Sequence, residues 1–213
     1  MNITIFGATG MVGKLIVRYG IALGHMVTAF GRNVDNLIDE DLRNDNLVAI
    51  KGSVFNELDV HNAIANADMV ISVLGGSVNG EDKTRSLGLK TIVHAMEKSG
   101  LKRIVALGGL GVLNDGNGKY LLDGKDYPEE FKKVGNEHLQ AYLTLKESNL
   151  DWTFVCPPTI KENEATGNFM VSATIAPHGG LNYIAAGDLA LFILYETIKK
   201  EYVHLKVGIV ATI

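Results

Sequence analysis

The sequence predicts an α/β protein with a doubly wound parallel sheet and helices on both faces of that sheet. Short apolar runs alternate with longer stretches at helical spacing almost to the end of the chain, and a glycine-rich turn joins the first run to the first such stretch. Of the 213 residues, 46% are apolar and 21% are charged, which supplies a core and excludes a disordered chain. We expect one domain over residues 1–213, because no Pro- or Ser-rich linker interrupts them.

Six apolar runs of four to six residues are typical of strands buried on both faces of a parallel sheet. They cover residues 3–6, 26–30, 47–50, 69–74, 103–107 and 152–156. Helical spacing predicts helices over 11–23, 57–65, 85–98, 130–148 and 188–199. Asp188 is expected to cap the last helix, and Gly100 to end the third. Two more short strands are expected over 168–175 and 204–210, with a turn at 177–180 between them.

Composition excludes several classes of function. Lysine and arginine total 20 against 24 aspartates and glutamates, a net charge of −4 without long blocks of one sign, so no nucleic-acid partner is expected. No apolar run approaches the roughly 18 residues of a membrane span, and no basic leader precedes the first strand, so no membrane association is expected. The single cysteine, Cys156, suits a reducing compartment, and we expect a cytoplasmic protein.

The glycine-rich turn carries the main functional signal. Its sequence is Gly7-Ala8-Thr9-Gly10-Met11-Val12-Gly13, with the spacing GxxGxxG. One glycine permits a sharp turn, the next lets backbone N–H groups approach a pyrophosphate, and the third lets the helix pack on the strand. The helix N-terminus adds partial positive charge. We therefore predict a Rossmann-type dinucleotide site at Gly7, Thr9, Gly10, Met11, Val12 and Gly13; a tight turn without a ligand is the alternative.

The end of the second strand indicates which dinucleotide binds. An NAD site places an acid about 20 residues beyond the glycines, where it accepts from the ribose 2′-hydroxyl. Here the strand is followed by Arg32 and Asn33. A planar guanidinium suits a 2′-phosphate and stacks on adenine, so we predict NADP at Arg32 and Asn33, with NAD less favoured. A solvated arginine at a strand end is the alternative interpretation.

Later strand ends are expected to complete the pocket, because ligands of an open α/β sheet lie along the carboxyl ends of its strands. Ser53 and Val54 are expected at the adenine. Backbone at Leu74, Gly75 and Gly76 is expected near the nicotinamide ribose. The residues expected to border the nicotinamide are Gly108, Gly109, Pro157, Pro158 and Thr159.

Several segments together resemble a known family. They are residues 5–10 (IFGATG), 68–72 (DMVIS), 103–106 (RIVA) and 147–153 (ESNLDWT), the last leading into Pro157-Pro158. The chain resembles the atypical short-chain dehydrogenases/reductases with NmrA-like NAD(P)-binding domains, in the branch of biliverdin reductase B and the bacterial NADH-flavin reductases. The resemblance implies a Rossmann core, a small C-terminal part at about 157–213 that covers the substrate, and hydride transfer to a conjugated acceptor such as a flavin.

The wider superfamily uses a tyrosine and a lysine four residues apart, the lysine holding the ribose while the tyrosine moves a proton. Tyr142 and Lys146 have this spacing but lie too close to Pro157. The resemblance places the lysine at Lys133 and the tyrosine at Glu129. Lys133 is therefore a catalytic candidate that would contact the ribose, with a solvated helix lysine as the alternative, and Tyr142 is interpreted as helix packing.

Two polar positions of the biliverdin reductase B branch differ here. Its serine after the fifth strand and its histidine after the two prolines match Gly109 and Thr159, so these positions lack the polar side chains that bilin reduction would use. Hydride transfer to a flavin depends less on such groups, since the two rings carry the chemistry and the protein positions them. The resemblance therefore favours a flavin over a bilin.

The loop of about 20 residues that ends at Pro128 is expected to be a lid or a substrate wall, because loops of this length in compact domains are usually functional. Tyr120 and Tyr127 in this loop would either stack on a planar acceptor or anchor the loop to the surface. The six histidines have no metal-ligand spacing and Cys156 stands alone, so no metal site is expected.

The sequence thus predicts an NADPH-preferring reductase of a small planar substrate such as a flavin. The alternative is a non-catalytic NmrA-like redox sensor, which binds the dinucleotide and reports its state to a partner. The short chain favours the reductase, and the missing tyrosine–lysine pair favours the sensor. We expect a monomer or a weak homodimer.

Overall fold

The computed structural model describes residues 1–37, 44–77, 79 and 81–212. Its main sheet has eight strands in the order β3-β2-β1-β4-β5-β6-β10-β8, parallel except for β8, which runs antiparallel to β10. A second sheet pairs β7 with β9. The strands are β1 Asn2–Phe6, β2 Met26–Gly31, β3 Leu47–Lys51, β4 Met69–Ser72, β5 Arg103–Leu107, β6 Asp151–Cys156, β7 Thr159–Lys161, β8 Phe169–Ala173, β9 Tyr183–Ala185 and β10 Leu205–Ala211. The helices are α1 Met11–Ala22, α2 Glu57–Ile64, α3 Leu89–Ser99, α4 Glu129–Glu147 and α5 Ala186–Lys199.

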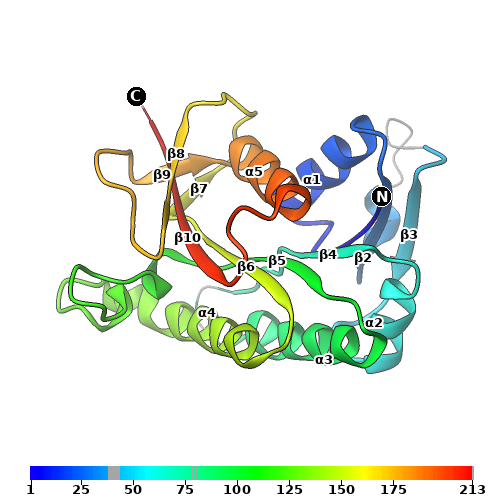
Figure 1. Ribbon diagram of the computed structural model, residues 1–213, viewed down its shortest axis with the longest axis horizontal. Coiled ribbons are helices and arrows are strands. Elements are labelled where there is room, and N and C mark those ends of the chain that lie inside the picture. Colours follow the sequence, from blue (N-terminus) through cyan, green and yellow to red (C-terminus); the bar gives the residue numbers. More distant parts are fainter. Residues whose placement is uncertain (38–43, 78, 80, 213) are drawn as a thin grey trace.

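Helices cover both faces of the sheet, as predicted. Figure 1 shows α1 and α5 above the sheet and α2, α3 and α4 below it. Alternate residues of the strands point to opposite faces, so Ile3 and Ile5 of β1 enter the upper core while Phe6 enters the lower one. No helix in the described part of the chain is both long and apolar enough to cross a membrane.

The six core strands and five helices lie where the sequence placed them, although some of their ends differ from the predicted ones. β4 ends at Ser72, two residues early, although the N–H of Val73 still donates to Phe6. The third helix begins with a π-helical turn, Thr84–Gly88, ahead of α3. Gly100 ends α3 with φ 78°, as expected of a C-terminal glycine.

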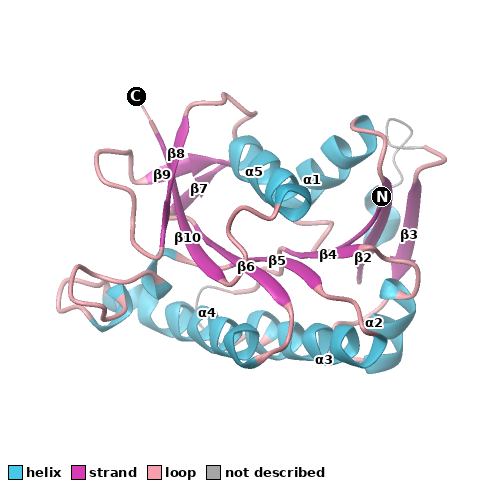
Figure 2. Cartoon of the chain, in the orientation of Figure 1, coloured by secondary structure: helices cyan, strands magenta, loops and turns pink. Residues whose placement is uncertain are grey.

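The two-stranded sheet of β7 and β9 was not predicted. Each of its strands has three residues, too few for an alternating pattern to be recognised in the sequence. Figure 2 shows this sheet beside α5, apart from the main sheet. It directs the chain after β6 across the carboxyl edge.

Asp188 does not cap α5, contrary to prediction. The helix begins two residues earlier, at Ala186, and the buried carboxylate accepts the N–H groups of Thr166 and Gly167 at 2.8 and 2.7 Å. It also accepts the hydroxyl of Thr166 at 2.8 Å. Asp188 therefore fixes the segment that joins β7 to β8, and no local pattern around it indicates a partner 22 residues away.

A buried ion pair ties the middle of the sheet to α5. The Nη2 atom of Arg103 on β5 lies 2.8 Å from Oε1 of Glu196, and both side chains are 2% exposed. Arg103 also donates to the carbonyls of Thr197 and Asp151 and to the hydroxyl of Thr153. Because these bonds satisfy the buried guanidinium, the pair fixes the position of α5 over the sheet.

We expect Asp188→Ala to lower the free energy of unfolding by about 2–4 kcal/mol, because three hydrogen bonds to a buried carboxylate are lost. Asp188→Asn keeps one acceptor oxygen and should lose less. Urea denaturation of the three proteins measures both effects. Equal stability of the alanine variant and the wild type would show that the segment at Thr166 is held by other contacts.

Candidate functional site

The first cavity, which we call the switch-point cavity, lies where the strand order reverses between β1 and β4. This is the place at which doubly wound sheets bind nucleotides. Its volume is about 400 Å³. Eleven of the predicted residues line it: Gly7, Thr9, Gly10, Met11, Val12, Arg32, Ser53, Val54, Leu74, Gly75 and Gly76. The sequence reasoning missed Phe30, Gly31, Gly52, Phe55, Val73, Thr84, Leu107 and Ile160.

Backbone contacts at the glycine turn shape this cavity. Gly7 has φ 84°, and a Cβ atom there would lie 2.5 Å from the carbonyl oxygen of Val73. A Cβ atom at Gly13 would lie 2.1 Å from the carbonyl oxygen of Gly7, whereas one at Gly10 would meet that oxygen at 3.4 Å. Gly13 lies outside the cavity lining, so its role is to let α1 pack on the turn, as predicted for the third glycine.

The first turn of α1 is open to an anion. No side chain caps it, and no acidic residue lies in it. Its N–H groups and the helix dipole therefore have no competing negative group at this end. This backbone fits the pyrophosphate of a dinucleotide.

Arg32 is the one cation among the described residues that line the switch-point cavity, and no described acid lines it. The side chain is exposed and forms no ion pair with any residue in the described ranges. Asn33 is also exposed but lies outside the lining. The charge around the cavity therefore suits an extra phosphate better than a ribose diol.

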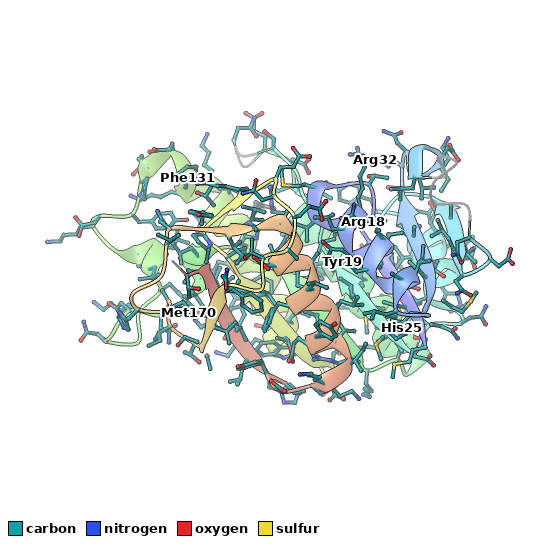
Figure 3. The ribbon with its side chains drawn as sticks, turned by 90° about the horizontal axis from the view of Figure 1, so that it is seen from above. Arg18, Tyr19, His25, Arg32, Phe131 and Met170 are labelled. Carbon is teal, nitrogen blue, oxygen red and sulfur yellow. The ribbon has the colours of Figure 1, made fainter. Side chains whose placement is uncertain are left out.

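The second cavity, which we call the β5–β6 cavity, follows the ends of those two strands and has a volume of about 560 Å³. Gly109, Pro157, Pro158 and Thr159, the residues expected to border a nicotinamide, line it. The two linings share no described residue, but they meet along the chain at β7, where Thr159 lines the β5–β6 cavity and the adjacent Ile160 lines the switch-point cavity. In Figure 3, Arg32 and Phe131, which line the two cavities, lie toward opposite ends of the upper edge of the molecule.

His138 is a polar group that the sequence reasoning missed. A Cβ atom at Gly109 would lie 2.8 Å from Cδ2 of its ring, so the imidazole of α4 fills the space beside this glycine. Burial, and then the charge of Arg85, lower the pKa of His138 to about 3, so the ring is neutral at pH 7. Its Nδ1 atom is buried without a hydrogen-bond partner in the described part of the chain. The wall beside Gly109 thus carries a neutral imidazole from α4, although position 109 itself has no polar side chain.

One signal in the sequence could have identified this wall. Phe131, Val134, Gly135 and His138 recur at helical spacing i, i+3, i+4 and i+7, and all four line the β5–β6 cavity. This face of α4 turns toward the carboxyl edge of the sheet. In the sequence, this face differs from a purely apolar one because it carries His138 and Gly135.

The two tyrosines of the long loop have different roles. The Tyr120 ring lies 6.3 Å from the ring of Tyr142, and Nζ of Lys206 lies 4.5 Å from its centre, so Tyr120 anchors the loop. Lys206 also donates to the carbonyl of Val112 at 2.6 Å and to Oδ1 of Asn114. Tyr127, in contrast, lines the β5–β6 cavity.

Two predicted residues of the active site lie elsewhere. Lys133 is exposed on α4, outside the lining of both cavities. Gly108 also lies outside, and a Cβ atom there would meet the Phe154 ring at 2.3 Å, so this glycine serves packing. Tyr142 is 8% exposed and packs against Trp152 and Phe154, in the position predicted for a packing residue.

Glu137, one turn beyond Lys133, is buried and makes two contacts with the π-helical turn and the residue before it. It accepts from Lys83 at 2.7 Å and from the hydroxyl of Ser86 at 2.6 Å. It therefore fixes α4 against the segment after β4. Among the described residues, no three His, Cys, Asp or Glu side chains are placed to hold a metal ion.

A family model described as NAD(P)H-binding matches residues 7–198. The chain belongs to this NAD(P)H-binding family. A solved structure from Burkholderia pseudomallei named "putative exported protein" is 31% identical, with 99% of each chain covered and a TM-score of 0.84. One from Streptococcus pneumoniae named "putative NADH-flavin reductase" is 25% identical over 100% of each chain, with a TM-score of 0.81. The uncharacterized protein YwnB of Bacillus subtilis is 25% identical over 95% of this chain and 94% of its own length. These matches confirm the predicted relation to the atypical short-chain dehydrogenases/reductases.

We expect Gly13→Ala to destabilise the fold by at least about 1–3 kcal/mol, because its Cβ atom would overlap backbone that cannot move aside. Gly10→Ala is the matched control and should cost less than about 1 kcal/mol, the difference between glycine and alanine at an N-cap. Its methyl group would stand in the switch-point cavity and should weaken NADPH binding without unfolding the protein. Urea denaturation and NADPH fluorescence titration measure the two effects. A Gly13→Ala variant as stable as the wild type would contradict the close contact.

Proposed function

We propose that the protein is an NADPH-preferring reductase that passes hydride to a small planar acceptor such as a flavin. The observation that carries the proposal is that two successive residues of β7 line the two cavities, Ile160 the switch-point cavity and Thr159 the β5–β6 cavity. A dinucleotide whose pyrophosphate lies at Gly7 to Gly13 and whose 2′-phosphate lies at Arg32 would extend its nicotinamide toward β7. The acceptor would lie beyond it, in the β5–β6 cavity.

Bound NADPH would supply a hydride, and the acceptor would take this electron pair together with a proton from solvent, leaving NADP⁺ and the reduced ring. The protein's own residues would bind and orient the two rings and exclude water from them. Leu107 and Ile160 are apolar residues in the lining of the switch-point cavity, and Pro157 and Pro158 are part of the wall of the β5–β6 cavity. This arrangement suits an acceptor whose ring system carries the chemistry.

One further observation supports a reductase of this type. The similar protein from Streptococcus pneumoniae carries the name "putative NADH-flavin reductase". The missing tyrosine–lysine pair of the wider superfamily favours the sensor, but it does not exclude a reductase of a flavin or quinone. A quinone or flavin needs no such pair, because its reduced form is stable without a tyrosine to move its proton. We further expect the protein to work in the cytoplasm as a monomer or weak homodimer.

We expect NADPH oxidation, followed by the absorbance of the reduced nicotinamide, to be faster with protein than without it when riboflavin or menadione is present. The protein-free mixture is the blank, and the Gly10→Ala variant should be slower at limiting NADPH. If the protein binds NADPH at micromolar concentration but does not oxidise it faster than the blank with any flavin or quinone, the proposed reductase activity is contradicted and the redox sensor is favoured.

We expect Arg32→Ala to weaken NADPH binding about tenfold, which corresponds to about 1.4 kcal/mol, and NADH binding less than about threefold. The reason is that the guanidinium contacts a phosphate present only in NADPH. Arg18→Ala removes an equal charge from α1, outside the cavity lining, and should leave both affinities within about twofold. Wild-type protein that binds NADPH and NADH equally well would defeat the proposed preference.

A further inference from the structure

We propose that the β5–β6 cavity selects an uncharged planar acceptor, a flavin or quinone ring without a phosphate, and that Asp126 rejects the phosphorylated forms. This inference rests on the proposed function and adds the chemical class of the acceptor. It follows from the charge of the cavity, from its walls and from two polar groups left without partners.

The walls of the cavity suit a flat apolar ring. Tyr127, Phe131 and Pro158 contribute rings to the lining, and Leu110 and Val134 add aliphatic side chains. Aromatic side chains stack on planar ligands in offset or edge-to-face arrangements. A volume of about 560 Å³ is within the roughly 300–1,000 Å³ of small-molecule sites.

Two glycines give Tyr127 its place in this wall. A Cβ atom at Gly111 would lie 2.7 Å from the Tyr127 hydroxyl oxygen, and one at Gly135 would lie 3.1 Å from it. Any larger residue at either position would displace the ring. The tyrosine is thus held by two backbone segments, which favours a fixed stacking surface over a mobile one.

The charge of the cavity is negative. Among the described residues that line it there is no lysine or arginine, and Asp126 is the single ionised group, because His138 is neutral at pH 7. Asp126 is exposed and forms no ion pair with any residue in the described part of the chain. A phosphate at this mouth would meet an unneutralised carboxylate and no countercharge, which is unfavourable at short range.

Lysines of the same region do not cancel this charge. Lys132 lies 2.6 Å from Glu129 and is paired with it. Lys125 and Lys133 are exposed and lie outside the lining. Glu129 and Glu130 occupy the first turn of α4, where they already complement the helix dipole. The helix N-terminus near the mouth therefore offers little attraction to a further anion.

The two polar groups of the wall are neutral. The Tyr127 hydroxyl, beside Gly111 and Gly135, forms no hydrogen bond with any residue that the structure describes, and Nδ1 of His138 is buried without a partner there. The hydroxyl can donate to a carbonyl oxygen or a ring nitrogen of the acceptor. Such groups recognise an isoalloxazine or quinone edge, whereas a phosphate would call for cations.

The test compares riboflavin with FMN, which differ by one phosphate. Binding to the protein saturated with NADP⁺ is followed by quenching of flavin fluorescence, so the readout does not depend on turnover. We expect riboflavin to bind at least about tenfold more tightly than FMN at low ionic strength. Added salt should narrow the ratio, because it screens the repulsion between the phosphate and Asp126.

Asp126→Asn should bring the two affinities within about threefold, mainly by improving FMN binding. Asp123→Asn is the matched control, since it removes an exposed carboxylate of the same loop that does not line the cavity, and it should keep the wild-type ratio. Equal affinities in the wild type, no riboflavin binding, or an unchanged ratio in Asp126→Asn would each overturn the inference. Selective riboflavin binding without NADPH oxidation would leave it standing and remove only the proposed catalysis.

Discussion

The close backbone contact at Gly7 and Gly13 is the constraint on which the rest of the site depends. Since neither residue has a side chain, the turn after β1 lies against the end of β4 on one side and against α1 on the other. That contact places the uncapped N-terminus of α1 beside the strand ends and opens the switch-point cavity between β1 and β4. A bulkier turn would separate α1 from the sheet, and the helix dipole would no longer face the cavity.

Buried polar anchors that lie outside both cavities hold the segments around the β5–β6 cavity. Lys206 on β10 holds the loop through Val112 and Asn114, and Asp188 holds the segment between β7 and β8. Burial lowers the pKa of Lys206, whose ammonium group is nevertheless satisfied by these acceptors and by the rings of Tyr120 and Tyr142. Buried charges of this kind cost desolvation energy, which their hydrogen bonds offset, and they fix one arrangement of the loops.

The sequence predicted what local pattern determines and missed what distant contacts determine. Apolar runs, the GxxGxxG turn and the capping glycine at Gly100 are local signals, and the strands, the switch-point cavity and the end of α3 follow from them. Asp188 looked like a helix cap because its neighbours in sequence resemble one, but its partners lie in another segment. His138 was missed because its importance comes from the space beside Gly109, which only the packing of α4 against the turn after β5 creates.

The opposite charges of the two cavities also bear on the orientation of a dinucleotide. NADPH carries its negative charge on the pyrophosphate and the 2′-phosphate, while its nicotinamide end lacks phosphate. The switch-point cavity offers Arg32 and the N-terminus of α1, and the β5–β6 cavity offers Asp126 and no described cation. A reversed dinucleotide would place phosphates next to Asp126, so electrostatics favours the orientation in which only the nicotinamide approaches β7. The charge pattern proposed to reject a phosphorylated acceptor would thus also keep the cofactor out of the acceptor's cavity.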